Sequence, residues 1–118
     1  MAGRTFEEFL LEYMAEALGE KIAVLLTQDA ISITIDDRQG LSEYHDEGTF
    51  FITCNFMQKE QADRALEKAA QAIAELPYAQ PMVMRTRRIA QDVKPAKAPR
   101  KWQYMGAFLI RWHTEDEY

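Results

Sequence analysis

The stretch WQYMGAFLIRWH, residues 102–113, decides the fold of this chain. Successive side chains of a β-strand point to opposite faces of the sheet. One face of this strand would carry Trp102, Tyr104, Gly106, Phe108, Ile110 and Trp112, and the other Gln103, Met105, Ala107, Leu109, Arg111 and His113. Both faces are substantially apolar, so a face that no helix covers implies a protein partner or self-association.

The residues before this strand predict its partner in a long C-terminal β-hairpin. Residues 82–91 form the first arm, and the segment between the arms, residues 93–101, reads VKPAKAPRK. Proline has no N–H to donate to a strand ladder, and a proline-rich segment favours extended structure. We therefore expect residues 93–101 to be an exposed, extended loop that does not pair.

Two segments upstream have helical periodicity. In residues 6–18 the apolar side chains fall at the spacing of one helix face, Thr5 forms a capping box with Glu8, and Gly19 stands where a C-terminal cap belongs. Residues 59–76 predict a second helix whose apolar stripe is narrow and mostly alanine, so it can pack close to a sheet. Proline cannot continue the hydrogen bonding of a helix, so we expect Pro77 to end it.

Three further strands complete the predicted sheet. Residues 22–27 and 31–35 read as two short strands joined by a turn, and residues 49–56 are rich in types that favour a central strand. Residues 36–48 are polar and open with the turn sequence DDRQG, which predicts a loop. The expected fold is α+β, with two helices packed on one face of a mixed, mostly antiparallel sheet of about five strands.

Length and composition set the broad class. The chain has 118 residues, 47% of them hydrophobic, which predicts one α+β domain over residues 1–118 with an acidic tail at 114–118. No stretch approaches the roughly 20 apolar residues that span a bilayer, so we expect no membrane contact. Cys54 is the only cysteine, which excludes an intrachain disulfide and a cysteine-based zinc site.

Basic residues are concentrated in one window. The chain carries 14 basic and 19 acidic residues, yet half of the basic ones lie in residues 85–101, where Asp92 is the only acid. Such segregation suits an interface with a surface of opposite charge, including another copy of the protein turned head to tail. The alternative is a solvated hairpin that keeps the protein soluble. The candidate interaction residues are Arg85, Arg87, Arg88, Lys94, Lys97, Arg100, Lys101 and Trp102.

No set of residues predicts catalysis. His45 beside Asp46 is the only pair that resembles an acid–base or metal site, and it and His113 are interpreted as surface histidines. Cys54 alternates with Phe and Ile and is interpreted as a buried small side chain. The sequence contains no glycine-rich phosphate loop and no nucleophile or zinc-protease motif. We expect no enzyme activity, no metal, no cofactor and no small-molecule substrate.

The order of the elements from Phe6 to Trp112 resembles that of the tail terminator, or tail-completion, proteins of long-tailed bacteriophages. Three stretches carry the resemblance: YHDEG at 44–48 leading into the strand at 49–56, the Ala/Leu/Ile-spaced helix at 61–76, and PRKWQY at 99–104 before an apolar strand. The resemblance implies a structural protein of the virion tail or neck, assembled in the host cytoplasm.

The resemblance also implies the partners of the protein. Proteins of this family form a ring, usually a hexamer, on the tail tube, stop tube polymerisation and present a surface for the head. The expected partners are other copies of the chain, the tail tube protein and a head-connector protein. Two alternatives stay open: a different α+β interaction module or small adaptor, and a nucleic-acid-binding protein that uses the basic hairpin with Trp102 and Tyr104. The sequence pI of about 5.0 disfavours the second.

Overall fold

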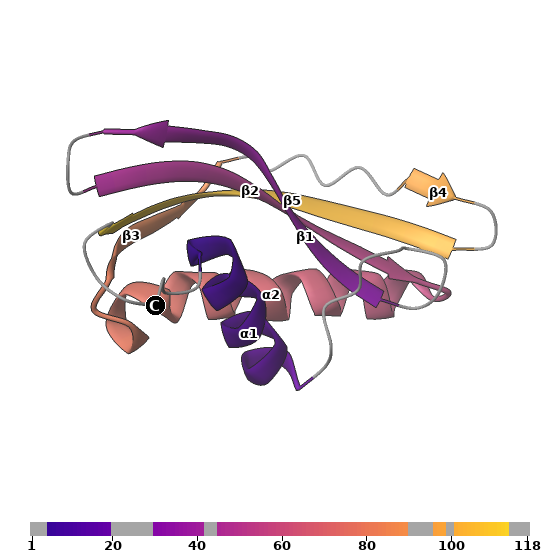
Figure 1. Ribbon diagram of the computed structural model, residues 1–118. Coiled ribbons are helices and arrows are strands. Elements are labelled where there is room, and N and C mark those ends of the chain that lie inside the picture. Colours follow the sequence, from indigo (N-terminus) through magenta and orange to yellow (C-terminus); the bar gives the residue numbers. More distant parts are fainter. Residues whose placement is uncertain (1–4, 20–29, 42–44, 90–95, 99–100, 114–118) are drawn as a thin grey trace.

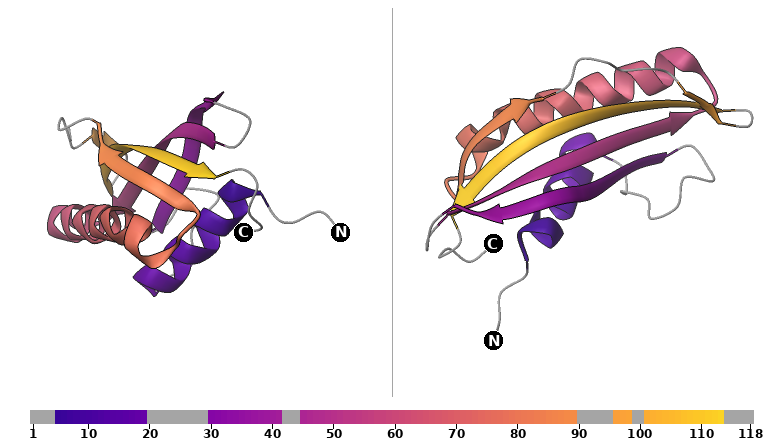
Figure 2. Two further views of the ribbon diagram at one scale, coloured as in Figure 1. Left: turned by 90° about the vertical axis from the view of Figure 1, so that its left-hand side faces the viewer. Right: turned by 90° about the horizontal axis from the view of Figure 1, so that it is seen from above.

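The computed structural model of the chain describes residues 5–19, 30–41, 45–89, 96–98 and 101–113 (Figure 1). These residues form an α+β fold in which two helices lie on one side of an antiparallel sheet, as Figure 2 shows from two further directions. The elements in chain order are α1 (Phe6–Leu18), β1 (Ala30–Gly40), β2 (His45–Phe56), α2 (Lys59–Ala79), β3 (Val83–Arg88), β4 (Ala96–Ala98) and β5 (Lys101–His113).

The sheet contains four long strands in the order β1-β2-β5-β3, and the short β4 pairs with β5. The predicted strands at 31–35 and 49–56 lie within β1 and β2, and β3 pairs with β5 as the arms of the predicted hairpin. Every described pairing is antiparallel, so the part of the sheet that the structure describes is antiparallel and not mixed. The predicted strand at 22–27 lies outside the described residues.

The predicted loop at 36–48 is wrong at both of its ends, at residues 36–40 and 45–48, and residues 42–44 lie outside the described part of the chain. β1 continues to Gly40 and β2 begins at His45, and the two remain paired to the end of the hairpin. A register shift between Ile35 and Asp37 accommodates the extra residue, as in a β-bulge. The polar side chains of this part of β1 are exposed on an edge strand, so turn-like composition is compatible with strand hydrogen bonding.

The predicted unpaired loop at 93–101 is also wrong in part. Ala96–Ala98 forms β4 and pairs with the first residues of β5, with Ala96 opposite Gln103 and Ala98 opposite Lys101. The two prolines of this segment fall outside the three-residue strand, so each paired residue has an N–H to donate.

Pro77 does not end α2, which continues to Ala79. In a regular helix the carbonyl of Ile73 would accept from the amide of residue 77, which proline lacks. Here it accepts a hydrogen bond from the Thr86 hydroxyl instead, so the proline leaves this carbonyl with a partner. The helix ends where the amide of Gln80 donates to the carbonyl of Leu76 at 2.9 Å. The prediction of a helix at this place was correct, and the predicted end was not.

Helix α1 begins and ends as its sequence predicts. The Glu8 amide donates to the Thr5 hydroxyl at 3.2 Å, and Gly19 adopts a left-handed conformation at φ 70°. The helix packs against the end of the sheet at which β2 begins and β5 ends. There the Phe6 ring stacks on Trp112, with ring centroids 4.1 Å apart and ring planes 6° apart. The first helix is therefore held on the last strand.

Candidate interaction surface

One face of the sheet, called here the open face, has no described element over it. Both helices lie on the other side (Figures 1 and 2). The centre of the open face is apolar: Met105 is 51% exposed, and Phe51 and Leu109 are half-buried. The amide of Ile89 donates to the carbonyl of Ala107 at 2.9 Å, which continues the β3–β5 pairing and adds an exposed Ile89 side chain. Such a surface suits contact with another protein.

Two of the predicted interaction residues lie at one end of the open face. Arg85 pairs in register with Arg111, and Arg87 pairs with Leu109. Both side chains are exposed, and neither makes an ion pair with another described residue. They form a basic end of the open face on the edge strand β3.

Arg88 does not join them. Its guanidinium lies on the helix side of the sheet, where Nη1 is 3.2 Å from Oε1 of Glu67 on α2. The guanidinium carbon also lies 5.7 Å from the centre of the Phe108 ring. Arg88 therefore holds α2 against the edge of the sheet, and its charge is already paired.

Three of the remaining predicted residues, Lys97, Lys101 and Trp102, lie at the other end of β5. Lys97 is opposite Trp102 in the β4–β5 ladder, and Lys101 begins β5. Trp102 packs against the core, and the Lys59 ammonium lies 5.6 Å from its ring centre. At about 3.3 Å per residue, the strand from Trp102 to Arg111 measures roughly 30 Å. Lys94 and Arg100 lie outside the described residues, and the others do not form one surface.

The structure brings together residues that the sequence left apart. His45 and His113 are direct partners in the β2–β5 ladder, with ring centroids 4.8 Å apart. Next to them Arg111 donates to Oε2 of Glu47 at 2.9 and 3.1 Å. No periodicity in the sequence predicts the histidine pair, because it depends on the register between strands far apart in the chain.

Asp46 does not form a site with His45, because neighbouring residues of a strand point to opposite faces. On the helix side, Oδ2 of Asp46 accepts from Arg38 at 2.9 and 3.1 Å, and Arg38 also reaches Glu7 of α1 at 2.9 Å. Desolvation lowers the pKa of Arg38, but the hydrogen bond to Asp46 and the charge of Glu7 outweigh it and raise that pKa. The guanidinium lies 5.4 Å from the centre of the Trp112 ring. This cluster fastens α1 to the sheet.

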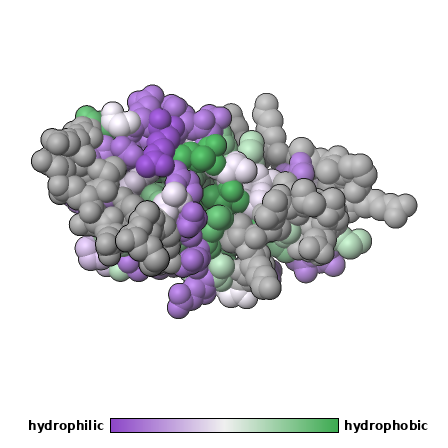
Figure 3. Space-filling model, viewed as in Figure 1, coloured by the Kyte–Doolittle hydropathy of each residue, from purple (hydrophilic) through white to green (hydrophobic). Residues whose placement is uncertain are grey.

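Acidic residues gather on the side of the molecule that carries α1. Glu8, Glu12 and Glu16 are exposed and recur every four residues along the helix. In Figure 3 the hydrophobic colour lies near the middle of this view, with hydrophilic side chains mainly above it and to its left. The edge strand β1 carries two further exposed acids in its second half, Asp36 and Asp37, which protect it from pairing with other edges. The acidic side and the basic end of the open face are on different parts of the molecule.

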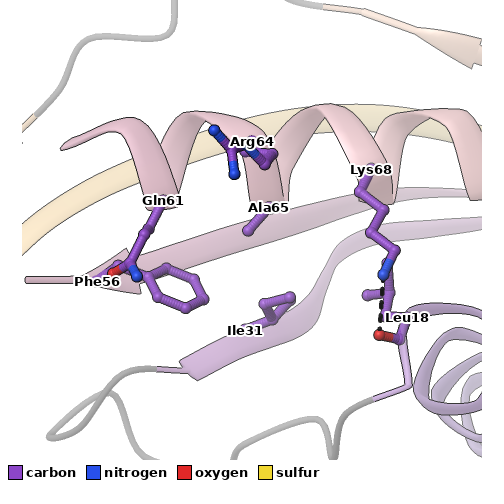
Figure 4. Close-up of a pocket in the computed structure, with 7 residues that line it drawn as sticks. All are labelled: Leu18, Ile31, Phe56, Gln61, Arg64, Ala65 and Lys68. Atoms are coloured by element: carbon purple, nitrogen blue, oxygen red, sulfur yellow. Dashed lines mark hydrogen bonds between the residues drawn. The ribbon is translucent and has the colours of Figure 1, made fainter. Parts of the chain in front are cut away.

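A pocket of about 240 Å³ lies between α2, the start of β1 and the last turn of α1 (Figure 4). Its lining residues are Leu18, Ile31, Phe56, Gln61, Arg64, Ala65 and Lys68. The Lys68 ammonium donates to the Leu18 carbonyl at 3.3 Å, which gives a partner to one of the terminal carbonyls of α1. Among the described lining residues there is no carboxylate, histidine or cysteine.

Neither described helix has the length and apolar character needed to cross a bilayer. Within the described part of the chain, no three His, Cys, Asp or Glu side chains come together at metal-binding distance. Comparison of the sequence with known protein families gives no match. Comparison with curated protein sequences gives no match either.

Proposed function

We propose that this protein is a tail terminator subunit of a long-tailed bacteriophage, a structural protein without catalytic activity. It assembles head to tail with copies of itself into a ring, a hexamer by the resemblance, on the end of the tail tube. The ring stops tube polymerisation and joins the tail to the head connector. The observation that carries the proposal is the exposed basic end formed by Arg85 and Arg87, which make no ion pair within the described part of the chain and are set apart from the acidic side of α1.

The charge arrangement supports a contact between two different surfaces. A head-to-tail interface uses one patch on each subunit and a different patch on its neighbour, and it closes when the rotation completes a ring. The exposed acids of α1 complement the two arginines on β3. The apolar centre of the open face, next to those arginines, supplies area that a neighbouring subunit can bury.

This arrangement narrows the predicted interaction set. Arg88 is engaged with Glu67, and Trp102 packs on the core, so neither is proposed as a contact. Arg85 and Arg87 are the proposed contacts with a neighbouring subunit. The proposed location is the tail or neck of the virion, with assembly in the host cytoplasm.

Native mass spectrometry of the wild type and two variants tests the proposal. We expect closed rings for the wild type, alone or on purified tail tubes, and their loss in Arg85→Glu/Arg87→Glu. Arg64→Glu, a reversal of an exposed arginine on α2, is the matched control and should keep the ring. Adding Glu8→Arg/Glu12→Arg to the first variant should restore assembly by exchanging the two charges.

Other results would contradict the proposal in distinct ways. A compact dimer and no larger species, with or without tail tubes, would support a small interaction module instead. Rings that form equally well in Arg85→Glu/Arg87→Glu would show that the contact surface lies elsewhere. Salt-sensitive binding of the wild type to labelled DNA would support the nucleic-acid alternative.

A further inference from the structure

The end of the β2–β5 ladder places the two histidines of the chain side by side on the open face. The sequence has 2 histidines, and the register makes them direct partners, His45 on β2 and His113 on β5. Their ring centroids are 4.8 Å apart and their planes are tilted by 58°. Both side chains are half-buried. Two imidazoles thus meet at a partly sheltered position on a regular sheet.

The backbone of each histidine is held by a hydrogen bond to a neighbouring segment. The Leu41 amide donates to the carbonyl of His45 at 2.9 Å, and the amide of His113 donates to the carbonyl of Met82 at 2.8 Å. These hydrogen bonds hold the two backbone positions that carry the imidazole rings at a fixed separation. A binding site built on them needs little rearrangement to accept a ligand.

The separation of the rings matches that of two imidazoles that share one metal ion. A transition metal lies about 2.1 Å from a coordinating imidazole nitrogen, and so roughly 3.2 Å from the ring centre. Two rings around one ion at angles of about 90–109° therefore have centres roughly 4.5–5.2 Å apart. The observed 4.8 Å falls inside this interval.

We propose that His45 and His113 bind a divalent transition-metal ion such as Zn²⁺, Ni²⁺ or Cu²⁺. Imidazole nitrogen suits these ions, whereas Mg²⁺ and Ca²⁺ prefer oxygen ligands. The nearby carboxylate of Glu47 is held by Arg111 at 2.9 Å, so the two histidines supply the protein ligands and water completes the coordination. The site is independent of the tail terminator proposal, because it needs a single chain.

Calorimetric titration of the full-length protein without a histidine tag tests the site. We expect one Ni²⁺ or Zn²⁺ ion per chain at pH 7.5 and no binding of Mg²⁺. His45→Gln and His113→Gln should each weaken the affinity by about tenfold or more, since even outer partners of a metal site contribute that much. Glu47→Gln, the matched control, should stay within about threefold of the wild type because it leaves both imidazoles in place.

A second measurement separates loss of the ligand from loss of the fold. The chain has 2 histidines, so NMR spectra contain two sets of imidazole ring signals, and both sets should shift together when Zn²⁺ is added. Thermal unfolding of the metal-free variants should match that of the wild type. Failure of Ni²⁺ and Zn²⁺ to bind at about 1 mM would overturn the proposal, as would binding that both histidine variants leave unchanged.

Discussion

The hydroxyl of Thr86 on β3 donates a hydrogen bond of 3.0 Å to the carbonyl of Ile73 on α2. In a regular helix this carbonyl accepts from the amide four residues later, but that residue is Pro77, which has no N–H. The sheet thus supplies the donor that the helix lacks. This contact explains why α2 passes through a proline that its sequence predicts as an end.

Replacing Thr86 by Val should lower the free energy of unfolding by about 1–2 kcal/mol. Valine keeps the branched shape of threonine but removes the hydroxyl, so the part-buried Ile73 carbonyl loses its hydrogen bond. Urea denaturation of the two proteins measures the difference.

The Pro77→Ala background shows whether the hydrogen bond is the cause. Alanine restores an amide that can donate to the Ile73 carbonyl. Thr86→Val should therefore lower the free energy of unfolding clearly less in the Pro77→Ala protein than in the wild type. An equal cost in both backgrounds would mean that Thr86 stabilises the protein by packing and not through this carbonyl.

Gly106 on β5 lets α2 approach the sheet closely. A Cβ at this position would lie 3.0 Å from Cε2 of Phe108 and 3.1 Å from Cδ1 of Leu66. Both of those side chains are buried, so they have little room to move. We expect Gly106→Ala to destabilise the protein by about 1–3 kcal/mol, measured by urea denaturation.

Gly40 provides the control for this substitution. A Cβ there would meet its nearest atom, Oδ1 of Asp46, at 3.6 Å, which is an ordinary contact, and the residue is exposed. Gly40→Ala should therefore change stability by less than about 0.5 kcal/mol. Equal losses for the two alanine variants would refute the close approach as the explanation for Gly106.

Arg38 joins β1 to β2 and to α1. Arg38→Gln removes the contacts with Asp46 and Glu7 and the stacking over Trp112, and we expect a loss of about 1 kcal/mol. The expected loss of stability is small because 46% of the Arg38 side chain is exposed, so solvent screens its ion pairs. Chemical denaturation by urea at low and high salt should show a smaller loss at high salt, since salt screens ion pairs. A loss independent of salt would assign the effect to packing on Trp112.

The elements that the sequence predicts well are those with a local signal. Helix α1 has its apolar spacing, its Thr5 cap and its Gly19 end within one segment, and all three are confirmed. The alternating faces of β5 are confirmed for the same reason. The end of α2 could not be predicted, because the donor that compensates for Pro77 comes from another element.

The candidate site depends on two bulges that the sequence does not reveal. With Val83 facing the core, simple alternation would turn Arg85 toward the helices, but a register shift between these residues turns it to the open face. A similar shift between Ile35 and Asp37 directs Arg38 to the helix side. A single extra residue in a strand thus exchanges the faces of every side chain after it.

The stacking of Phe6 on Trp112 has a consequence for synthesis of the protein on the ribosome. Helix α1 is made first, but its aromatic partner lies on the last strand, and the central strand β2 also pairs with β5 along its full length. The nascent chain can form its helices and the β1–β2 hairpin early, whereas its core closes only after β5 has left the exit tunnel. Until β5 emerges, β2 lacks one of its two neighbouring strands and the Phe6 ring lacks the Trp112 ring on which it stacks.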